Sequence, residues 1–340
     1  MSKKLKSLTL PTPDGQNVTY TLISEWDDIE NKPAISAGEG ELSIQEGNGT
    51  TASGQDAHAE GFTTIASGGH SHAEGNRTQA TQNGAHAEGV RTIASGIGAH
   101  AEGWETKAFG ENSHAEGCGT IARGQWSHAE GKTTTASGTR SHAEGIGTIA
   151  SGTISHAEGN ESEAYGSTSH AEGAQTLAEG GASHSEGKKT IAKGKFSHAE
   201  GSNTYECDVT IVESCRLKGL SNKFPTTDIN LLQGKAVELQ FSGSDTITTE
   251  IDGVDSEHGL DWTVPVLDSK YNNKTALALI SFTGIADGYI SHVEGLGTIT
   301  NGEISHAEGV ETTAAGFVSH SEGYLTYADG NYSHAEGYKT

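Results

Sequence analysis

Polar and apolar positions repeat along this chain with a period of 14 residues, and the repeat predicts its fold. Each repeat reads Ser-His-Ala-Glu-Gly-x-x-Thr-x-Ala-Ser-Gly-x-x, with local variation. A degenerate earlier copy is found at Ser43-Ile44-Gln45-Glu46-Gly47. The histidines of the complete copies are His58, His72, His86, His100, His114, His128, His142, His156, His170, His184, His198, His292, His306, His320 and His334.

We number the positions of each repeat 1 to 14 from its Ser, and this numbering separates two faces. Side chains alternate between the faces of a strand, so positions 1, 3 and 5 share one face while His and Glu share the other. The Thr, Ala and Gly at positions 8, 10 and 12 likewise share a face. A wall of such small residues suits a very thin coil, with Gly at the bends. The pattern predicts an all-β chain, a parallel β-solenoid with one turn per 14 residues stacked about 4.8 Å apart.

The repeat also predicts the domain organisation. The step from His198 to His292 is 94 residues, one period plus 80, so an 80-residue insertion preserves the phase. We therefore expect a non-repeating N-terminal segment (1–42), a solenoid (43–205), an inserted domain (206–285) and a continued solenoid (286–340) that ends within a repeat. Short strand-like runs separated by Gly, Asp, Asn and Pro predict a small antiparallel β domain in the insert.

Composition narrows the possible functions. Hydrophobic residues make up 32% of the 340 residues, against the roughly 45–50% of an ordinary globular domain, so a conventional enzyme core is not expected. The formal net charge of −24 disfavours nucleic acid and anionic membranes as partners.

No apolar run approaches the roughly 20 residues that a membrane span needs, and no signal peptide is recognised, so we expect assembly in a cytosol. Three cysteines without zinc-type spacing indicate neither a disulfide framework nor a metal cluster.

His and Glu are the candidate functional residues, because they are unchanged in all fifteen complete copies while neighbouring positions vary. We favour a structural ladder in which each His bonds a Glu of the same or a neighbouring chain, with no metal, cofactor or catalytic role. A column of metal sites is a second interpretation, and Ser-His-Glu catalysis is a third, disfavoured because catalysis uses one positioned triad. The glutamates are Glu60, Glu74, Glu88, Glu102, Glu116, Glu130, Glu144, Glu158, Glu172, Glu186, Glu200, Glu294, Glu308, Glu322 and Glu336.

The S-x-A-x-G string followed by A-x-G resembles the head repeat of the trimeric autotransporter (YadA-like) adhesins. The S-H-A-E-G form resembles repeats in bacteriophage tail-fibre and tail-spike proteins. The resemblance covers about residues 43–205 and 286–340, and it implies a left-handed parallel β-roll packed as a homotrimer. It further implies a non-enzymatic virion protein, assembled in the host cytoplasm, that attaches the phage to its host. The alternatives are a bacterial surface adhesin and, less favoured, a glycan-degrading tail spike.

Two further segments carry candidate contacts. Trp26, Asp27, Asp28, Ile29, Lys32 and Pro33 form a string that resembles an element preceding the shaft of phage fibres. It suggests attachment to other tail or baseplate proteins, with a hairpin that caps the solenoid as the alternative. In the insert, Phe224, Asp261, Trp262 and Tyr271 are candidates for contact with a host glycan or protein, although aromatic residues in so small a domain more often form its core.

Overall fold

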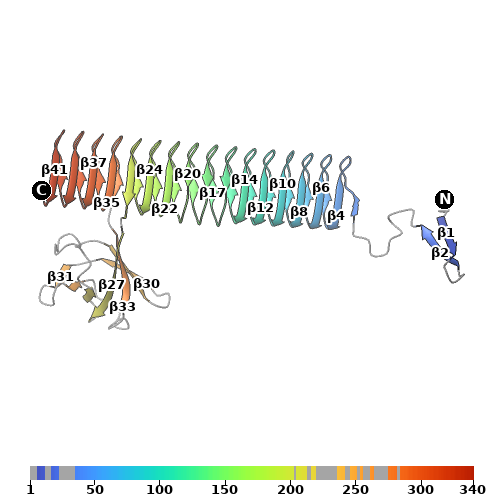
Figure 1. The fold of residues 1–340 in the computed structure, drawn as a ribbon, viewed down its shortest axis with the longest axis horizontal. Helices are drawn as coiled ribbons and strands as arrows, with labels where there is room; N and C mark the ends of the chain where they lie inside the picture. The colour runs from blue at the N-terminus through green and yellow to red at the C-terminus, as the bar shows by residue number, and fades with distance from the viewer. Residues whose placement is uncertain are drawn as a thin grey trace. The chain divides into compact units, whose positions relative to one another are not determined.

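The computed structural model describes residues 6–11, 17–22, 35–202, 204–212, 216–219, 236–241, 246–250, 253–255, 261–263, 275–281 and 284–340. Strands and turns account for all regular structure in these residues, and none of them is helical. About sixteen turns of parallel β-solenoid, with 14 residues per turn, confirm the predicted fold class (Figure 1). By contacts the chain falls into two units, Met1–Gly119 and Thr120–Thr340.

In the first unit, an antiparallel pair of strands precedes the solenoid, β1 (Lys6–Pro11) with β2 (Asn17–Leu22). Strand β3 (Ile35–Ala37) then pairs antiparallel with the first strand of the solenoid and covers its open edge. The first parallel sheet contains β4 (Ile44–Asn48), β6 (His58–Phe62), β8 (His72–Asn76), β10 (His86–Val90), β12 (His100–Trp104) and β14 (His114–Cys118). The second contains β5 (Thr51–Ala52), β7 (Ile65–Ala66), β9 (Gln79–Ala80), β11 (Ile93–Ala94) and β13 (Lys107–Ala108).

The second unit repeats both sheets. The first sheet contains β16 (His128–Ala129), β18 (His142–Ala143), β20 (His156–Ala157), β22 (His170–Ala174), β24 (His184–Lys188), β26 (His198–Gly201), β35 (His292–Leu296), β37 (His306–Val310), β39 (His320–Tyr324) and β41 (His334–Tyr338). The second contains β15 (Ile121–Ala122), β17 (Thr135–Ala136), β19 (Ile149–Ala150), β21 (Glu163–Ala164), β23 (Leu177–Ala178), β25 (Ile191–Ala192), β34 (Ile285–Ala286), β36 (Ile299–Thr300), β38 (Thr313–Ala314) and β40 (Tyr327–Ala328).

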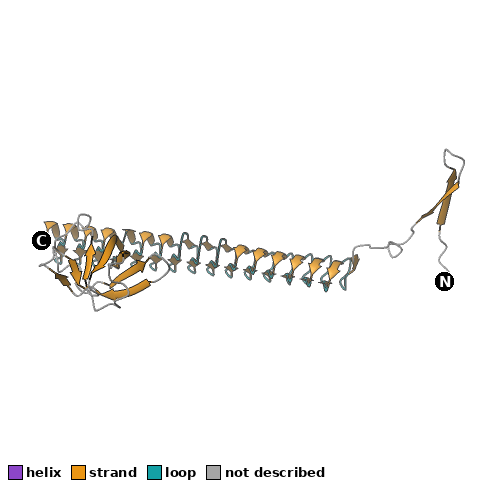
Figure 2. Cartoon of the chain, turned by 90° about the horizontal axis from the view of Figure 1, so that it is seen from below, coloured by secondary structure: helices purple, strands orange, loops and turns teal. Residues whose placement is uncertain are grey.

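Figure 2 draws the strands of the solenoid as orange arrows joined by teal loops. Small side chains fill the space between the two sheets. Positions 1, 3, 8 and 10 of the turns are buried, and they hold Ser or Ala, Ala, Thr and Ala in most turns. The position 1 serines bond the chain that precedes them: Ser141 Oγ donates to Gly138 O at 2.7 Å, and the same bond recurs in the other described turns that carry Ser there, except at Ser333 in the last turn. The interior thus combines methyl groups with hydroxyls. Most position 1 serines are hydrogen-bonded, whereas several position 8 threonines, such as Thr64 and Thr78, have a buried Oγ1 without a hydrogen bond.

The inserted residues form a seven-stranded antiparallel sheet in the order β30-β29-β33-β27-β28-β32-β31. Tyr205 belongs to this sheet, facing Ile280, whereas Ile285 already belongs to the solenoid and pairs with Ile191. The exchange therefore occurs a few residues before the expected boundaries, which the period could not locate because 202–205 and 284–286 both fit the repeat. The strands are β27 (Thr204–Val212), β28 (Arg216–Gly219), β29 (Ala236–Phe241), β30 (Thr246–Glu250), β31 (Gly253–Asp255), β32 (Asp261–Thr263) and β33 (Thr275–Ser281).

The turns on either side of the insertion stack directly on one another. Strand β26 pairs with β35 so that His198 lies opposite His292, and β25 pairs with β34. The phase read from the sequence is thus preserved in the structure.

Candidate functional site

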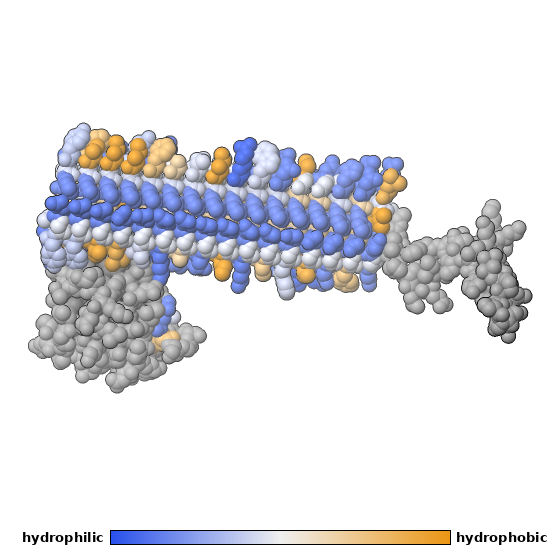
Figure 3. Space-filling view, viewed as in Figure 1, coloured by the Kyte–Doolittle hydropathy of each residue, from blue (hydrophilic) through white to orange (hydrophobic). Residues whose placement is uncertain are grey.

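The repeated His and Glu lie on the outer face of the first sheet, and we call them the His–Glu column. Its first segment runs from His58 to Glu116 in the first unit, and its second from His128 to Glu336 in the second unit. In-register parallel pairing sets identical residues above one another, as for His86 with His100 and Glu88 with Glu102. Because Ala at position 3 points inward and is fully buried, the His and Glu on either side of it point outward. In Figure 3, rows of hydrophilic side chains run along the solenoid from one turn to the next.

The imidazoles of each segment form a regular stack. Centroids of neighbouring rings are 4.7–4.9 Å apart and the ring planes lie within 8° of parallel. The spacing is that of hydrogen-bonded strands, so the sheet rather than ring attraction sets it. About a third of the side chain remains exposed in most turns, 35% for His142 and 34% for Glu130, and more in the last turn.

Each imidazole Nε2 points towards carboxylates. In the first segment it lies nearest Glu of its own turn, at 3.5 Å for His72 to Glu74 Oε2. In the first turns of the second segment it lies nearest Glu of the preceding turn: the Nε2–H of His142 donates to Glu130 Oε1 at 3.1 Å. His198 lies between both kinds of partner, 3.3 Å from Glu186 Oε1 and 3.8 Å from Glu200 Oε2.

Burial and neighbouring charges shift the pKa values of the column. Desolvation, followed by the charge of neighbouring imidazoles, lowers the pKa of His72, His86, His156 and His292. A hydrogen bond with the neighbouring carboxyl, Glu186, together with desolvation raises the pKa of Glu200 to about 7.

From Glu130 to Glu200, the column carboxyls alternate in the direction of their pKa shifts. A hydrogen bond with Glu158 raises the pKa of Glu144, and a bond with Glu144 lowers the pKa of Glu158. Stacked carboxylates would repel each other by about 1 kcal/mol per pair even at the dielectric of water. A proton shared between two neighbouring carboxyls would reduce that repulsion, which agrees with the raised pKa of Glu144 and its hydrogen bond with Glu158.

The hydroxyl at position 1 is separated from the imidazole at position 2. Ser141 is buried on the inner face and its Oγ donates to Gly138 O, while His142 points outward to Glu130. A serine nucleophile needs its base within hydrogen-bond reach, and alternate faces of a strand do not provide this. The geometry therefore favours the ladder over Ser-His-Glu catalysis.

The other candidates from the sequence are placed only in part. Asp261 and Trp262 lie in strand β32 of the inserted sheet, where only the backbone is described. Phe224, Tyr271 and the six residues of the Trp26–Pro33 string fall outside the described residues.

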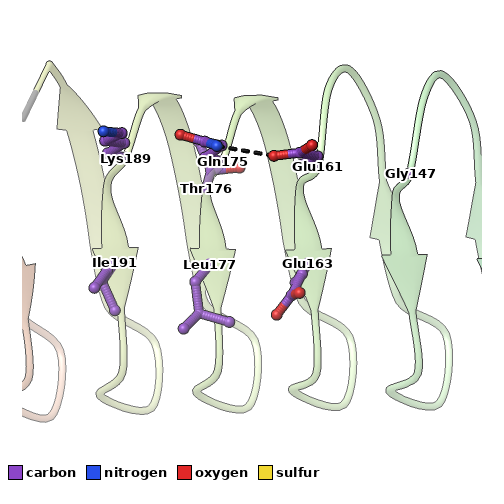
Figure 4. A pocket seen from close by; sticks show the side chains of 8 residues that line it. All are labelled: Gly147, Glu161, Glu163, Gln175, Thr176, Leu177, Lys189 and Ile191. Atoms are coloured by element: carbon purple, nitrogen blue, oxygen red, sulfur yellow. Dashed lines mark hydrogen bonds between the residues drawn. The ribbon is translucent and has the colours of Figure 1, made fainter. Parts of the chain in front are cut away.

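A shallow groove of about 440 Å³ on the second sheet was not anticipated as a site (Figure 4). It lies between positions 7 and 9, where Gly147 leaves room beside Glu161, and Gln175 Nε2 donates to Glu161 Oε2 at 2.8 Å. Leu177 and Ile191 form its apolar side. From residue 65 to 163, position 9 alternates between Ile and Gln, Lys, Thr or Glu, a pattern typical of a half-exposed edge. Position 9 is half-buried in nearly all described turns.

No protein-family model matches the chain, and no curated protein matches it either. Within the described residues, no helix is long and apolar enough to cross a membrane.

Proposed function

We propose that this chain is a non-enzymatic structural subunit of a bacteriophage tail fibre or spike, that it assembles as a homotrimer and that it helps attach the virion to its host. One observation carries the proposal: His and Glu recur unchanged on the outer face of the first sheet in fifteen turns, while the corners vary. A surface that is the same in every turn suits contact with identical chains. Variable corners suit contact with an external partner.

The thin interior supports association. Among the buried residues of the solenoid, Ala, Ser and Thr predominate, and Val293 is the largest apolar side chain that is fully buried there. Burial contributes about 25 cal/mol per Å² of apolar surface, whereas ordering the backbone costs roughly 1–2 kcal/mol per residue. Small side chains supply little of the required area, so further surface buried between chains would stabilise the fold. We place the His–Glu column at that interface.

The corners supply candidate contacts with the host. Trp104 and Trp126 remain 56% and 45% exposed. Apolar residues gather at the corners of the turns after the insert, among them Ile304 and Val318 (Figure 3). Exposed aromatic residues on a stiff scaffold are typical of recognition surfaces. The insert and the Trp26–Pro33 string would add a recognition module and an attachment to other tail proteins.

The native mass of the full chain at neutral pH tests the proposal. Three chains of 35.2 kDa give about 106 kDa, and that mass is expected. A monomer that unfolds in one cooperative transition would contradict the proposal that surface buried between chains stabilises the fold. Immunodetection distinguishes a phage fibre from the alternative, a bacterial surface adhesin. A fibre subunit is found in purified virions, whereas an adhesin is found on the bacterial surface. Release of reducing ends from host capsule would instead indicate a glycan-degrading spike.

A further inference from the structure

Imidazole nitrogens in the His–Glu column are shielded from solvent but lack hydrogen-bond partners. Within the described residues, ten Nε2 atoms are buried without a hydrogen bond, although their rings remain partly exposed. Each of the ten instead lies 3.3–4.0 Å from a carboxylate oxygen, close enough for an ion pair but without an aligned hydrogen bond. The repetition of this arrangement turn after turn calls for a common explanation. The ten atoms belong to His58, His72, His86, His100, His156, His170, His198, His292, His306 and His320.

Carboxylate oxygens lie near all ten nitrogens, and at His58 and His198 oxygens from two successive turns both lie within 4.0 Å of Nε2. His58 Nε2 lies 3.6 Å from Glu60 Oε2 of its own turn and 3.9 Å from Glu46 Oε1 of the preceding turn. The corresponding distances for His198 are 3.8 and 3.3 Å. Two ligand atoms bound to one tetrahedral ion at about 2.1 Å are separated by about 3.4 Å. Small side-chain movements would therefore bring one nitrogen and two oxygens onto a single cation.

We propose that the His–Glu column is an array of sites for divalent transition-metal ions of the zinc class. Each ion takes Nε2 of one His, one oxygen of the Glu in the same turn and one of the Glu in the preceding turn. Water or a partner molecule completes the coordination. All three ligands come from one chain, so the sites do not depend on the proposed trimer.

Stack geometry limits how the ligands combine. Neighbouring rings are nearly parallel and 4.7–4.9 Å apart, so their Nε2 atoms are separated by about the same distance. Two nitrogens on one zinc ion can be at most about 4.2 Å apart, which excludes two stacked histidines as ligands of the same ion. Each ion therefore has one imidazole.

Ligand chemistry and charge determine which ions bind and how many. Imidazole nitrogen favours zinc, copper, nickel and cobalt, whereas calcium and magnesium prefer sites made of oxygen alone. Two carboxylates offset the charge of a divalent ion. Ions in successive turns would lie about 4.8 Å apart and repel each other, so alternate turns fill first.

The test titrates the metal-free full chain with Zn²⁺ by calorimetry and with Co²⁺ by visible absorption. We expect saturable zinc binding, about one ion for every two complete turns, and the intense cobalt absorption of a four-coordinate site. Calcium at the same concentration should give no heat of binding. Absence of saturable zinc binding, or equal binding of calcium, would overturn the proposal.

Replacing five consecutive column histidines (His142, His156, His170, His184 and His198) by Gln should lower the zinc stoichiometry by about a third, in proportion to the turns lost. The matched control is His70→Gln, because His70 lies at a corner, outside the column and 3.4 Å from Asp56.

A second variant, Glu144→Gln with Glu158→Gln and Glu172→Gln, keeps the imidazole stack and should also lose sites. If His70→Gln lowers the stoichiometry as much as the five-fold variant does, the column is not the site. Native mass measured on each sample distinguishes loss of metal from loss of assembly.

Discussion

Ser185 Oγ lies 2.8 Å from Thr190 Oγ1 inside one turn of the solenoid, and Ser321 and Thr326 form the same pair at 2.7 Å in another. Both serines occupy position 3, where most turns have Ala. The Thr at position 8 thus offers a partner to a buried hydroxyl on the facing strand. The interior accepts a polar atom at this point because the Thr is already in place.

Ala143→Ser should consequently change the free energy of unfolding by less than about 1 kcal/mol, since Thr148 lies where Thr190 does in its turn. Ala143→Leu should destabilise by about 3 kcal/mol or more, because Ala143 is fully buried and the sheets cannot separate locally to admit three further carbons. Chemical denaturation of the two variants measures the difference. Equal stabilities would show that the interior is less tightly packed than the structure indicates.

Glycine at position 12 is required by the stacking of turns. A Cβ on Gly152 would overlap the carbonyl oxygen of Gly166 in the next turn. We expect Gly152→Ala to cost more than about 3 kcal/mol or to prevent folding, as measured by thermal melting.

Gly147 provides the matched control for Gly152. It has a φ of 67°, but its corner is open, and a Cβ there would approach Glu161 Cγ at 3.4 Å. Most turns have a larger residue at that corner, so Gly147→Asn should stay within about 1 kcal/mol of the parent. Comparable losses in both variants would point to backbone conformation rather than overlap between turns.

Position 14 carries avoidable strain. Ile154 has a φ of 58°, a left-handed conformation that costs about 1–2 kcal/mol for a β-branched residue, whereas Gly98 occupies the equivalent corner at 63°. Ile154→Asn should therefore raise the melting temperature, with a gain of about 1 kcal/mol, because Asn tolerates this conformation. Ile149→Asn is the control, since Ile149 lies in strand β19 and should lose stability. A lower melting temperature for Ile154→Asn would show that Ile154 makes compensating contacts at an interface.

The sequence alone allowed the period, the inward and outward positions and the preserved phase to be predicted, because each depends on local alternation repeated many times. Corner strain was not predictable: Ile154, Ile290 and Ile304 are poor residues for a left-handed φ, and the geometry of the turn overrides their preference. The sequence also did not predict which Glu lies nearest each imidazole Nε2. His72 and His142 have the same neighbours in sequence, but their nearest carboxylates come from different turns.

Acid should destabilise the metal-free protein, as melting curves recorded with a chelator between pH 7.5 and 5 will show. Burial holds the pKa of seven column histidines below the ordinary 6.5, so below that pH the unfolded chain binds more protons than the native chain. These residues are His72, His86, His128, His156, His170, His292 and His306. The stability contributed by neutral imidazoles is complete above pH 6.5 and decreases as the pH falls towards the native pKa values. Raised carboxyls at Glu144, Glu172 and Glu200 act in the opposite direction, since they favour the native state at lower pH, but they are fewer. Replacing His128, His156 and His170 by Gln should flatten the profile. A melting temperature that rises on acidification would mean that the His–Glu ion pairs outweigh desolvation.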